Sequence, residues 1–167
     1  MAKVGKPKVG GGKMSRSETV TVRLDPKLRY LAELAARRQR RTVSSYIEWA
    51  IEESLSSVLL DESNSVALAA TKLWDVDEPD RFAKLAFRYP DMLTHEEQTL
   101  WKLIRESGML WLGDYCKPDN KWTWTVEEDS MDTERLREYW DIFNAIAKGD
   151  AKKSSLPKWG APDDDCC

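Results

Sequence analysis

Apolar and polar residues alternate along residues 18–24, and the pattern changes to helical spacing immediately afterwards. Strict alternation predicts a half-buried strand, because successive side chains of a strand point to opposite faces. The apolar face holds Val20, Val22 and Leu24, and the polar face holds Thr19, Thr21 and Arg23.

Two helices are predicted directly after this strand. Asp25 and Pro26 form a helix start, in which a capping side chain precedes proline at the first helical position. This helix is expected to reach about Arg40, and Thr42 is expected to cap the second helix. The apolar residues at helical spacing are Leu28, Leu31, Leu34 and Ala35 in the first helix, and Val43, Ile47, Ala50, Ile51, Leu55 and Val58 in the second.

A lone strand with two helices needs a partner. About 40 residues cannot usually enclose a stable core, and the strand would leave backbone groups unpaired along both edges. A second copy of the chain solves both problems if the two strands pair antiparallel and turn their apolar faces toward the shared helices. The polar faces would then form a two-stranded ribbon, which fits the major groove of B-DNA.

Beyond a polar junction at residues 61–65, the pattern predicts a mainly helical body with one β-hairpin. The segments MLWLGDY and KWTWTVEE flank residues 116–120, which predicts a hairpin with Trp122, Trp124 and Val126 on one face. Helices are expected over residues 66–74, 77–89 and 132–148, and from the capping box of Thr94 and Glu97 to Gly108.

Charge divides the chain more sharply than its net value of −3 suggests. Residues 1–45 contain twelve Lys or Arg and three acidic residues, a net charge of +9, whereas the remainder carries −12. A basic end on an acidic body indicates a polyanion-binding segment attached to a body that avoids the same polyanion. The predicted organisation is a disordered basic arm (1–16), a strand-helix-helix domain (17–60), an acidic Trp-rich domain (61–148) and a disordered tail (149–167).

The segment TVTVRLDPKLRYLAELAARRQRRTVSSYIEWAIEESL resembles the ribbon-helix-helix fold of the Arc, MetJ and CopG repressors. The resemblance covers residues 18–58 and rests on the strand face, the proline-started helix, the basic turn and the Thr-capped second helix. It implies an intertwined homodimer that inserts its ribbon into the major groove. The expected fold class is therefore mainly α, with an N-terminal ribbon-helix-helix domain and a helical accessory domain that carries a small β-hairpin.

Residue roles follow from this resemblance and from side-chain chemistry. Arg23 could contact guanine O6 and N7, worth ~1–3 kcal/mol of discrimination, whereas threonine suits several bases. The expected base-reading residues are Thr19, Thr21 and Arg23. The start of the second helix favours anions, and the neighbouring arginines add positive charge. The expected phosphate-binding residues are therefore Arg40, Arg41, Thr42, Val43 and Ser44. The expected dimer core is Val20, Val22, Leu24, Leu28, Leu31, Ile47, Ile51 and Leu55.

No enzyme, metal site or cofactor is expected from the sequence. His95 is the only histidine, and it is expected to be a solvated residue at a helix start. Gly-rich phosphate loops and recognised nucleophile motifs are missing from the sequence. Three cysteines and no membrane-length apolar run favour a reduced cytoplasmic setting, and the expected binding to DNA adds nucleoid association.

The expected function is sequence-specific transcriptional regulation, as a repressor of bacterial or phage type that binds double-stranded DNA as a homodimer or a higher oligomer. One alternative is an antitoxin or plasmid-maintenance factor, whose C-terminal domain would bind a protein partner. Another is an interaction or scaffold module that uses the ribbon unit only to dimerise. Seven of the eight tryptophans follow residue 60, and they are expected either to pack in a core or to form a contact surface.

Overall fold

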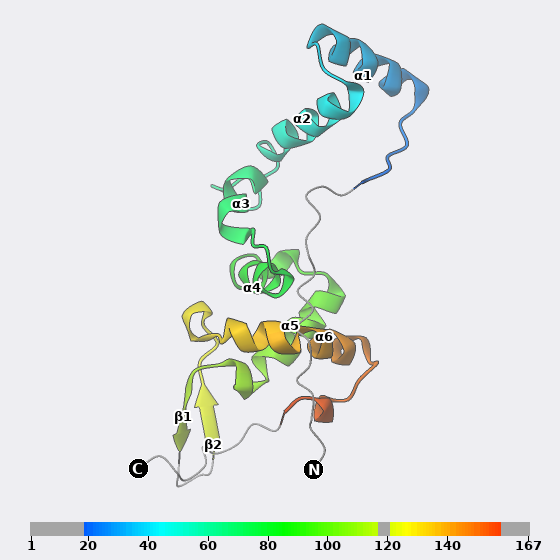
Figure 1. The fold of residues 1–167 in the computed structure, drawn as a ribbon. Coiled ribbons are helices and arrows are strands. Elements are labelled where there is room, and N and C mark those ends of the chain that lie inside the picture. Colours follow the sequence, from blue (N-terminus) through cyan, green and yellow to red (C-terminus); the bar gives the residue numbers. More distant parts are fainter. Residues whose placement is uncertain (1–18, 117–120, 158–167) are drawn as a thin grey trace. The chain divides into compact units, whose positions relative to one another are not determined.

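The computed structural model describes residues 19–116 and 121–157 (Figure 1). Predictions for the basic arm, the hairpin turn at residues 117–120 and residues 158–167 lie outside the described residues. The described part is mainly helical with a small two-stranded antiparallel sheet, which confirms the predicted fold class at this level. Its helices are α1 (Pro26–Arg38), α2 (Val43–Leu55), α3 (Val66–Leu73), α4 (Glu78–Arg88), α5 (His95–Arg105) and α6 (Thr133–Lys148), and its strands are β1 (Gly113–Cys116) and β2 (Lys121–Trp124).

The chain forms two compact units, and the division falls between Lys72 and Leu73. Within the described part, we call residues 19–72 the N-terminal unit and residues 73–157 the C-terminal unit. The N-terminal unit holds α1, α2 and nearly all of α3, whereas the sequence prediction ends its first domain at residue 60.

Local side chains fix where α1 and α2 begin, as predicted. The Asp25 carboxylate accepts hydrogen bonds from two backbone N–H groups of the first turn of α1, each at 3.0 Å. The Thr42 hydroxyl accepts from the backbone N–H of Ser45 at 3.1 Å. Both caps satisfy donors that a helix start otherwise leaves without a partner.

The N-terminal unit has almost no apolar core within one chain. In residues 19–72 the buried apolar residues are two alanines, Ala36 and Ala69. Residues 19–25 belong to no helix and no strand, so the predicted strand has no pairing partner among residues 19–116 and 121–157 of the single chain. After α2, an antiparallel bridge between Leu59 and Ser65 closes a short loop that leads into α3.

The C-terminal unit encloses a conventional core between α4, α5 and α6. Fourteen buried apolar residues form one cluster, in which Ile104, Leu110, Leu136 and Phe143 have no exposed surface. Aromatic rings contribute much of the packing, with ring centroids 4.9–6.3 Å apart between neighbours. Burial of this extent explains why these residues fold together.

Tryptophan indoles also complete the C-terminal end of α5. The Nε1–H of Trp111 donates to the carbonyl of Ile104 at 3.0 Å, and that of Trp124 donates to the carbonyl of Arg105 at 3.1 Å. These are among the last carbonyls of the helix, which have no partner within it. A Cβ on Gly108 would lie 2.9 Å from the Trp124 ring, so glycine at this position makes room for the hairpin.

Residues 149–157 differ from the disordered tail predicted from the sequence. Gly149 ends α6 in the left-handed conformation with φ 85°, and a single 3-10 turn covers Lys153–Ser155. Leu156 packs against the core, and Lys153 Nζ lies 3.0 Å from the carboxylate of Glu106. These contacts attach residues 149–157 to the C-terminal unit. The spacing of apolar residues in the sequence does not predict them.

Candidate nucleic-acid interface

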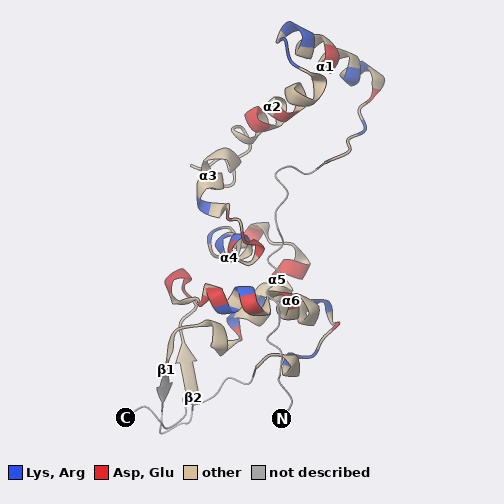
Figure 2. Ribbon diagram, in the orientation of Figure 1, with Lys and Arg blue, Asp and Glu red and all other residues tan. Residues whose placement is uncertain are grey.

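Four exposed arginines lie at the end of α1 and in the turn that follows, Arg37, Arg38, Arg40 and Arg41 (Figure 2). Cations near a helix C-terminus interact favourably with its dipole. Glu33 forms ion pairs with Arg29 at 3.3 Å and with Arg37 at 4.0 Å. Within the described residues, Arg38, Arg40 and Arg41 have no ion pair, so most of the charge at this turn is not neutralised.

Arg40 gives the turn its shape. It has φ 55° and is the one non-glycine residue of the described part with a positive φ. The next backbone N–H, that of Arg41, donates to the carbonyl of Ala36 at 2.9 Å, as at a helix end with a left-handed residue. Glycine usually occupies this position because a side chain costs about 1–2 kcal/mol there. The sequence prediction missed this feature, because an arginine gives no sign of a left-handed conformation, which usually requires glycine.

The start of α2 follows this turn directly. Thr42 caps the helix, Ser44 is exposed and Val43 is half-buried. The five predicted phosphate-binding residues, which are consecutive in the sequence, span the turn and the first two residues of α2. Free N–H groups and arginine side chains here can bind an anion.

Arg41 also contacts α2 through an aromatic ring. Its guanidinium carbon lies 5.4 Å from the centre of the Trp49 ring. Trp49 in turn packs against Tyr46, with ring centroids 5.6 Å apart and an interplanar angle of 41°. The sequence analysis did not find this contact, because residues 41 and 49 belong to different elements.

The predicted base-reading residues, Thr19, Thr21 and Arg23, are all exposed and precede α1. In the part of the chain that the structure describes, no hydrogen bond or ion pair connects them to the arginine-rich turn. Their side chains therefore remain available to a ligand, and their base-reading role stays a prediction.

The predicted dimer-core residues are exposed or half-buried in the single chain. Val20 is 79% exposed and Val22 is 60% exposed. Leu24 and Ile47 are half-buried, and the other four, Leu28, Leu31, Ile51 and Leu55, are 37–54% exposed. Large apolar side chains exposed in this number usually mark a contact with another molecule.

Three carboxylates of the C-terminal unit, those of Asp75, Asp77 and Asp80, lie within 4.8 Å of one another and could together hold a cation. Two basic side chains already bind this cluster. Arg137 donates two hydrogen bonds to the buried Asp80 at 2.7 and 2.9 Å, which raise the pKa of the guanidinium. Lys84 donates to Asp75 at 2.7 Å and lowers the pKa of that carboxyl. The cluster is an ion-pair network that joins α4 to α6.

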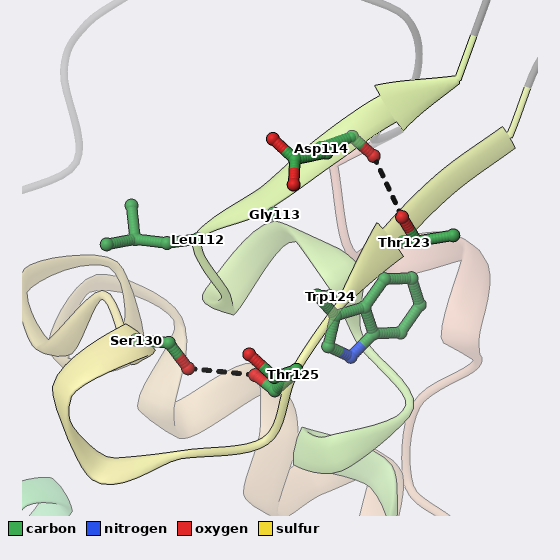
Figure 3. A pocket seen from close by; sticks show the side chains of 7 residues that line it. All are labelled: Leu112, Gly113, Asp114, Thr123, Trp124, Thr125 and Ser130. Atoms are coloured by element: carbon green, nitrogen blue, oxygen red, sulfur yellow. Dashed lines mark hydrogen bonds between the residues drawn. The ribbon is translucent and has the colours of Figure 1, made fainter.

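A hollow of about 460 Å³ lies beside the hairpin (Figure 3). The Thr123 hydroxyl donates to the carbonyl of Asp114 at 3.2 Å, and the Ser130 hydroxyl donates to that of Thr125 at 2.8 Å. The hydroxyls of Thr123 and Ser130 therefore serve the backbone. Among the described residues that line this hollow, none is a histidine, cysteine or lysine that could activate them.

His95 is the first residue of α5 and is exposed. The cap before it is the predicted capping box of Thr94 and Glu97, which the structure confirms. No helix in the described ranges has both the length and the apolar character needed to cross a membrane.

The chain matches no protein-family model, no curated protein and no solved structure. The functional argument therefore depends on the residues and contacts described above.

Proposed function

We propose that the N-terminal unit is the DNA-binding half of a homodimeric transcriptional repressor of the ribbon-helix-helix kind. The observation that carries the proposal is the apolar surface of this unit. Large apolar side chains alternate along residues 20–24 and recur along α1 and α2, yet the apolar residues buried in residues 19–72 are two alanines. A unit of this size does not stay folded without burying such side chains.

A second copy of the chain supplies the missing partner. Residues 19–24 of the two chains pair as antiparallel strands, which satisfies their backbone groups along one edge. Val20, Val22 and Leu24 then face the four helices of the dimer, and Leu28, Leu31, Ile47, Ile51 and Leu55 complete the shared core. The ribbon presents Thr19, Thr21 and Arg23 on its outer face, where they reach base edges in the major groove.

The positive charge of the arginine-rich turn also supports the proposal. Arg38, Arg40 and Arg41 have no ion pair within the described residues, and the start of α2 offers backbone N–H groups beside them. Together with Thr42, Val43 and Ser44, they contact the phosphates that flank the groove. These contacts orient the ribbon, and Arg23 supplies most of the base discrimination.

The C-terminal unit serves protein contacts in this proposal, either between neighbouring dimers on DNA or with a separate partner. Five of its tryptophans, residues 101, 111, 122, 124 and 140, are buried or half-buried, whereas Trp74 is 59% exposed. Tryptophan is enriched among the residues that dominate protein interfaces, so the exposed Trp74 is the tryptophan that supports this role. Cooperative binding to tandem sites would be lost on removing residues 73–167, and a titration curve unchanged by this deletion would exclude the role.

Fluorescence anisotropy with DNA from upstream of the gene tests the function. The protein is titrated against this DNA and against a scrambled duplex at two salt concentrations. Tighter binding to the upstream DNA, weakened by salt, is expected. Equal and weak binding to both duplexes would instead favour a dimerising scaffold module.

The variant Arg23→Ala tests the reading face. We expect it to lose ~1–3 kcal/mol of discrimination between the two duplexes while the dimer stays intact. Arg88→Ala is the charge-matched control, because Arg88 lies on α4 and pairs with Glu128 in the C-terminal unit. Loss of the dimer in Arg23→Ala would contradict the assignment of this side chain to the outer face.

A further inference from the structure

Arg41 contacts an aromatic ring, whereas Arg29 and Arg37 of the N-terminal unit contact a carboxylate. Arg29 and Arg37 interact with the carboxylate of Glu33, whereas the Arg41 guanidinium lies over the indole of Trp49 at 5.4 Å. Trp49 is half-buried on α2 and contacts Tyr46. The Trp49 ring therefore packs between Tyr46 and the exposed side chain of Arg41.

The kind of contact decides what remains available for a ligand. A carboxylate neutralises a guanidinium and occupies its N–H donors, which point outward in the plane of the group. An aromatic ring attracts the cation through its face and leaves this charge in place. The contact with Trp49 restrains the Arg41 side chain. Because Arg41 has no ion pair within the described residues, its charge is not neutralised.

We propose that Trp49 is a positioning residue that holds Arg41 ready to bind a DNA phosphate. The inference rests on the proposed DNA-binding function and adds to it a residue outside the predicted interface. Restraining a long side chain before binding lowers the entropy lost when the contact forms. Phosphate affinity is thereby raised without any contact between Trp49 and DNA.

The helix spacing separates Trp49 from the proposed dimer core. Residues two apart on an α-helix point about 160–200° from each other, so Trp49 lies nearly opposite Ile47 and Ile51. A change at Trp49 should therefore leave the dimer intact. This separation makes the role of Trp49 testable by substitution.

A double-mutant cycle tests the proposal, with affinity for the upstream DNA measured by anisotropy in the full-length protein. Trp49→Leu removes the ring and should weaken binding about two- to fivefold per protomer, whereas Trp49→Phe keeps an aromatic face and should lose less. Arg41→Gln removes the charge. If Trp49 acts through Arg41, adding Trp49→Leu to Arg41→Gln causes no further loss.

Arg38→Gln provides the matched cycle. Arg38 is exposed and lacks an ion pair among the described residues, as Arg41 does, but it has no aromatic contact there. The losses caused by Trp49→Leu and Arg38→Gln should therefore multiply. Sedimentation equilibrium on each variant shows whether the dimer is retained.

A spectroscopic measurement covers the case in which Trp49→Leu does not fold. The protein is labelled with 5-fluorotryptophan, and the resonance of residue 49 is assigned as the one missing from Trp49→Phe. Arg41→Gln should shift this resonance in the free protein, and Arg38→Gln should not.

Three results would overturn the inference. Multiplying losses in both cycles, or a Trp49 resonance insensitive to Arg41→Gln, would exclude the positioning role while leaving DNA binding established. A wild-type protein without salt-dependent DNA affinity would overturn the proposed function, and the inference would fall with it.

Discussion

The two units of this chain bury their apolar residues to opposite degrees. The C-terminal unit encloses fourteen buried apolar residues in one cluster, whereas the N-terminal unit buries two alanines in its described part. Both contain well-capped amphipathic helices, so the difference lies in what the apolar faces contact. Helices can therefore form where no apolar core forms, and within one chain the N-terminal unit has helices but almost no core.

This difference has a thermodynamic consequence. The free energy of unfolding of the C-terminal unit should not depend on protein concentration, because its core is formed within one chain. That of the N-terminal unit should rise with concentration, since folding is coupled to dimer formation. Each of the following changes tests one side of this contrast.

Val22→Lys should have the largest effect. Val22 is 60% exposed in the single chain, where a lysine would be tolerated. In the proposed dimer, each of the two lysines would be a buried unpaired charge that costs about 3–5 kcal/mol, enough to abolish the dimer. Sedimentation equilibrium measures the outcome, with the neighbouring Thr21→Lys as the control that should remain dimeric. A folded dimer of Val22→Lys would show that the strand register is wrong.

Phe143→Ala should be the next largest change. Phe143 has no exposed surface, so its truncation should lower the free energy of unfolding of the C-terminal unit by about 3–5 kcal/mol. Urea unfolding monitored by far-UV circular dichroism measures this loss. Leu112→Ala, at a residue 68% exposed, should change stability by less than about 0.5 kcal/mol. Similar losses in the two variants would contradict the assigned core.

Arg137→Met should have an intermediate effect. It leaves the buried carboxylate of Asp80 without its two hydrogen bonds from Arg137. We expect a loss of about 2 kcal/mol in the free energy of unfolding, less than for a fully buried pair because the Arg137 side chain is 43% exposed. Arg88→Met breaks the exposed pair with Glu128 and should cost less than about 1 kcal/mol in the same urea titration. Equal losses would mean that the burial of Asp80 adds nothing to the pair.

The pH dependence of the C-terminal unit should show the smallest effect. Hydrogen bonds from Lys84 and Lys153 lower the pKa values of Asp75 and Glu106 below their ordinary values of 3.8 and 4.5. A lowered carboxyl pKa stabilises the fold above the pKa of the unfolded state, and this contribution is lost as the pH falls through the folded pKa. The melting temperature should therefore exceed that of Asp75→Asn/Glu106→Gln at pH 6, and this difference should shrink as the pH falls below the ordinary carboxyl pKa values and through the lowered ones. A difference that persists at low pH would assign these side chains a role other than ion pairing.

Features encoded by nearby residues could be predicted from the sequence. The starts of α1 and α2 depend on Asp25 and Thr42, whose side chains bond to N–H groups two or three residues away. The capping box before α5 is equally local. Apolar spacing likewise predicted the helices and the hairpin, because it follows the geometry of each element.

Contacts between distant residues could not be predicted in this way. The indole of Trp124 reaches the end of α5, and Leu156 reaches the core from beyond α6. At the candidate site, the sequence indicated which residues carry charge but not that Trp49 contacts Arg41. Side-chain packing of this kind depends on how elements meet, and periodicity carries no information about it.

The left-handed conformation of Arg40 has a consequence for the selection of variants. Glycine at position 40 would relieve the backbone cost at φ 55°, so a screen for thermal stability alone should favour Arg40→Gly. The same substitution removes one arginine per protomer from the turn, and the salt dependence of DNA binding should weaken accordingly. Stability and affinity would therefore be selected in opposite directions at a single codon.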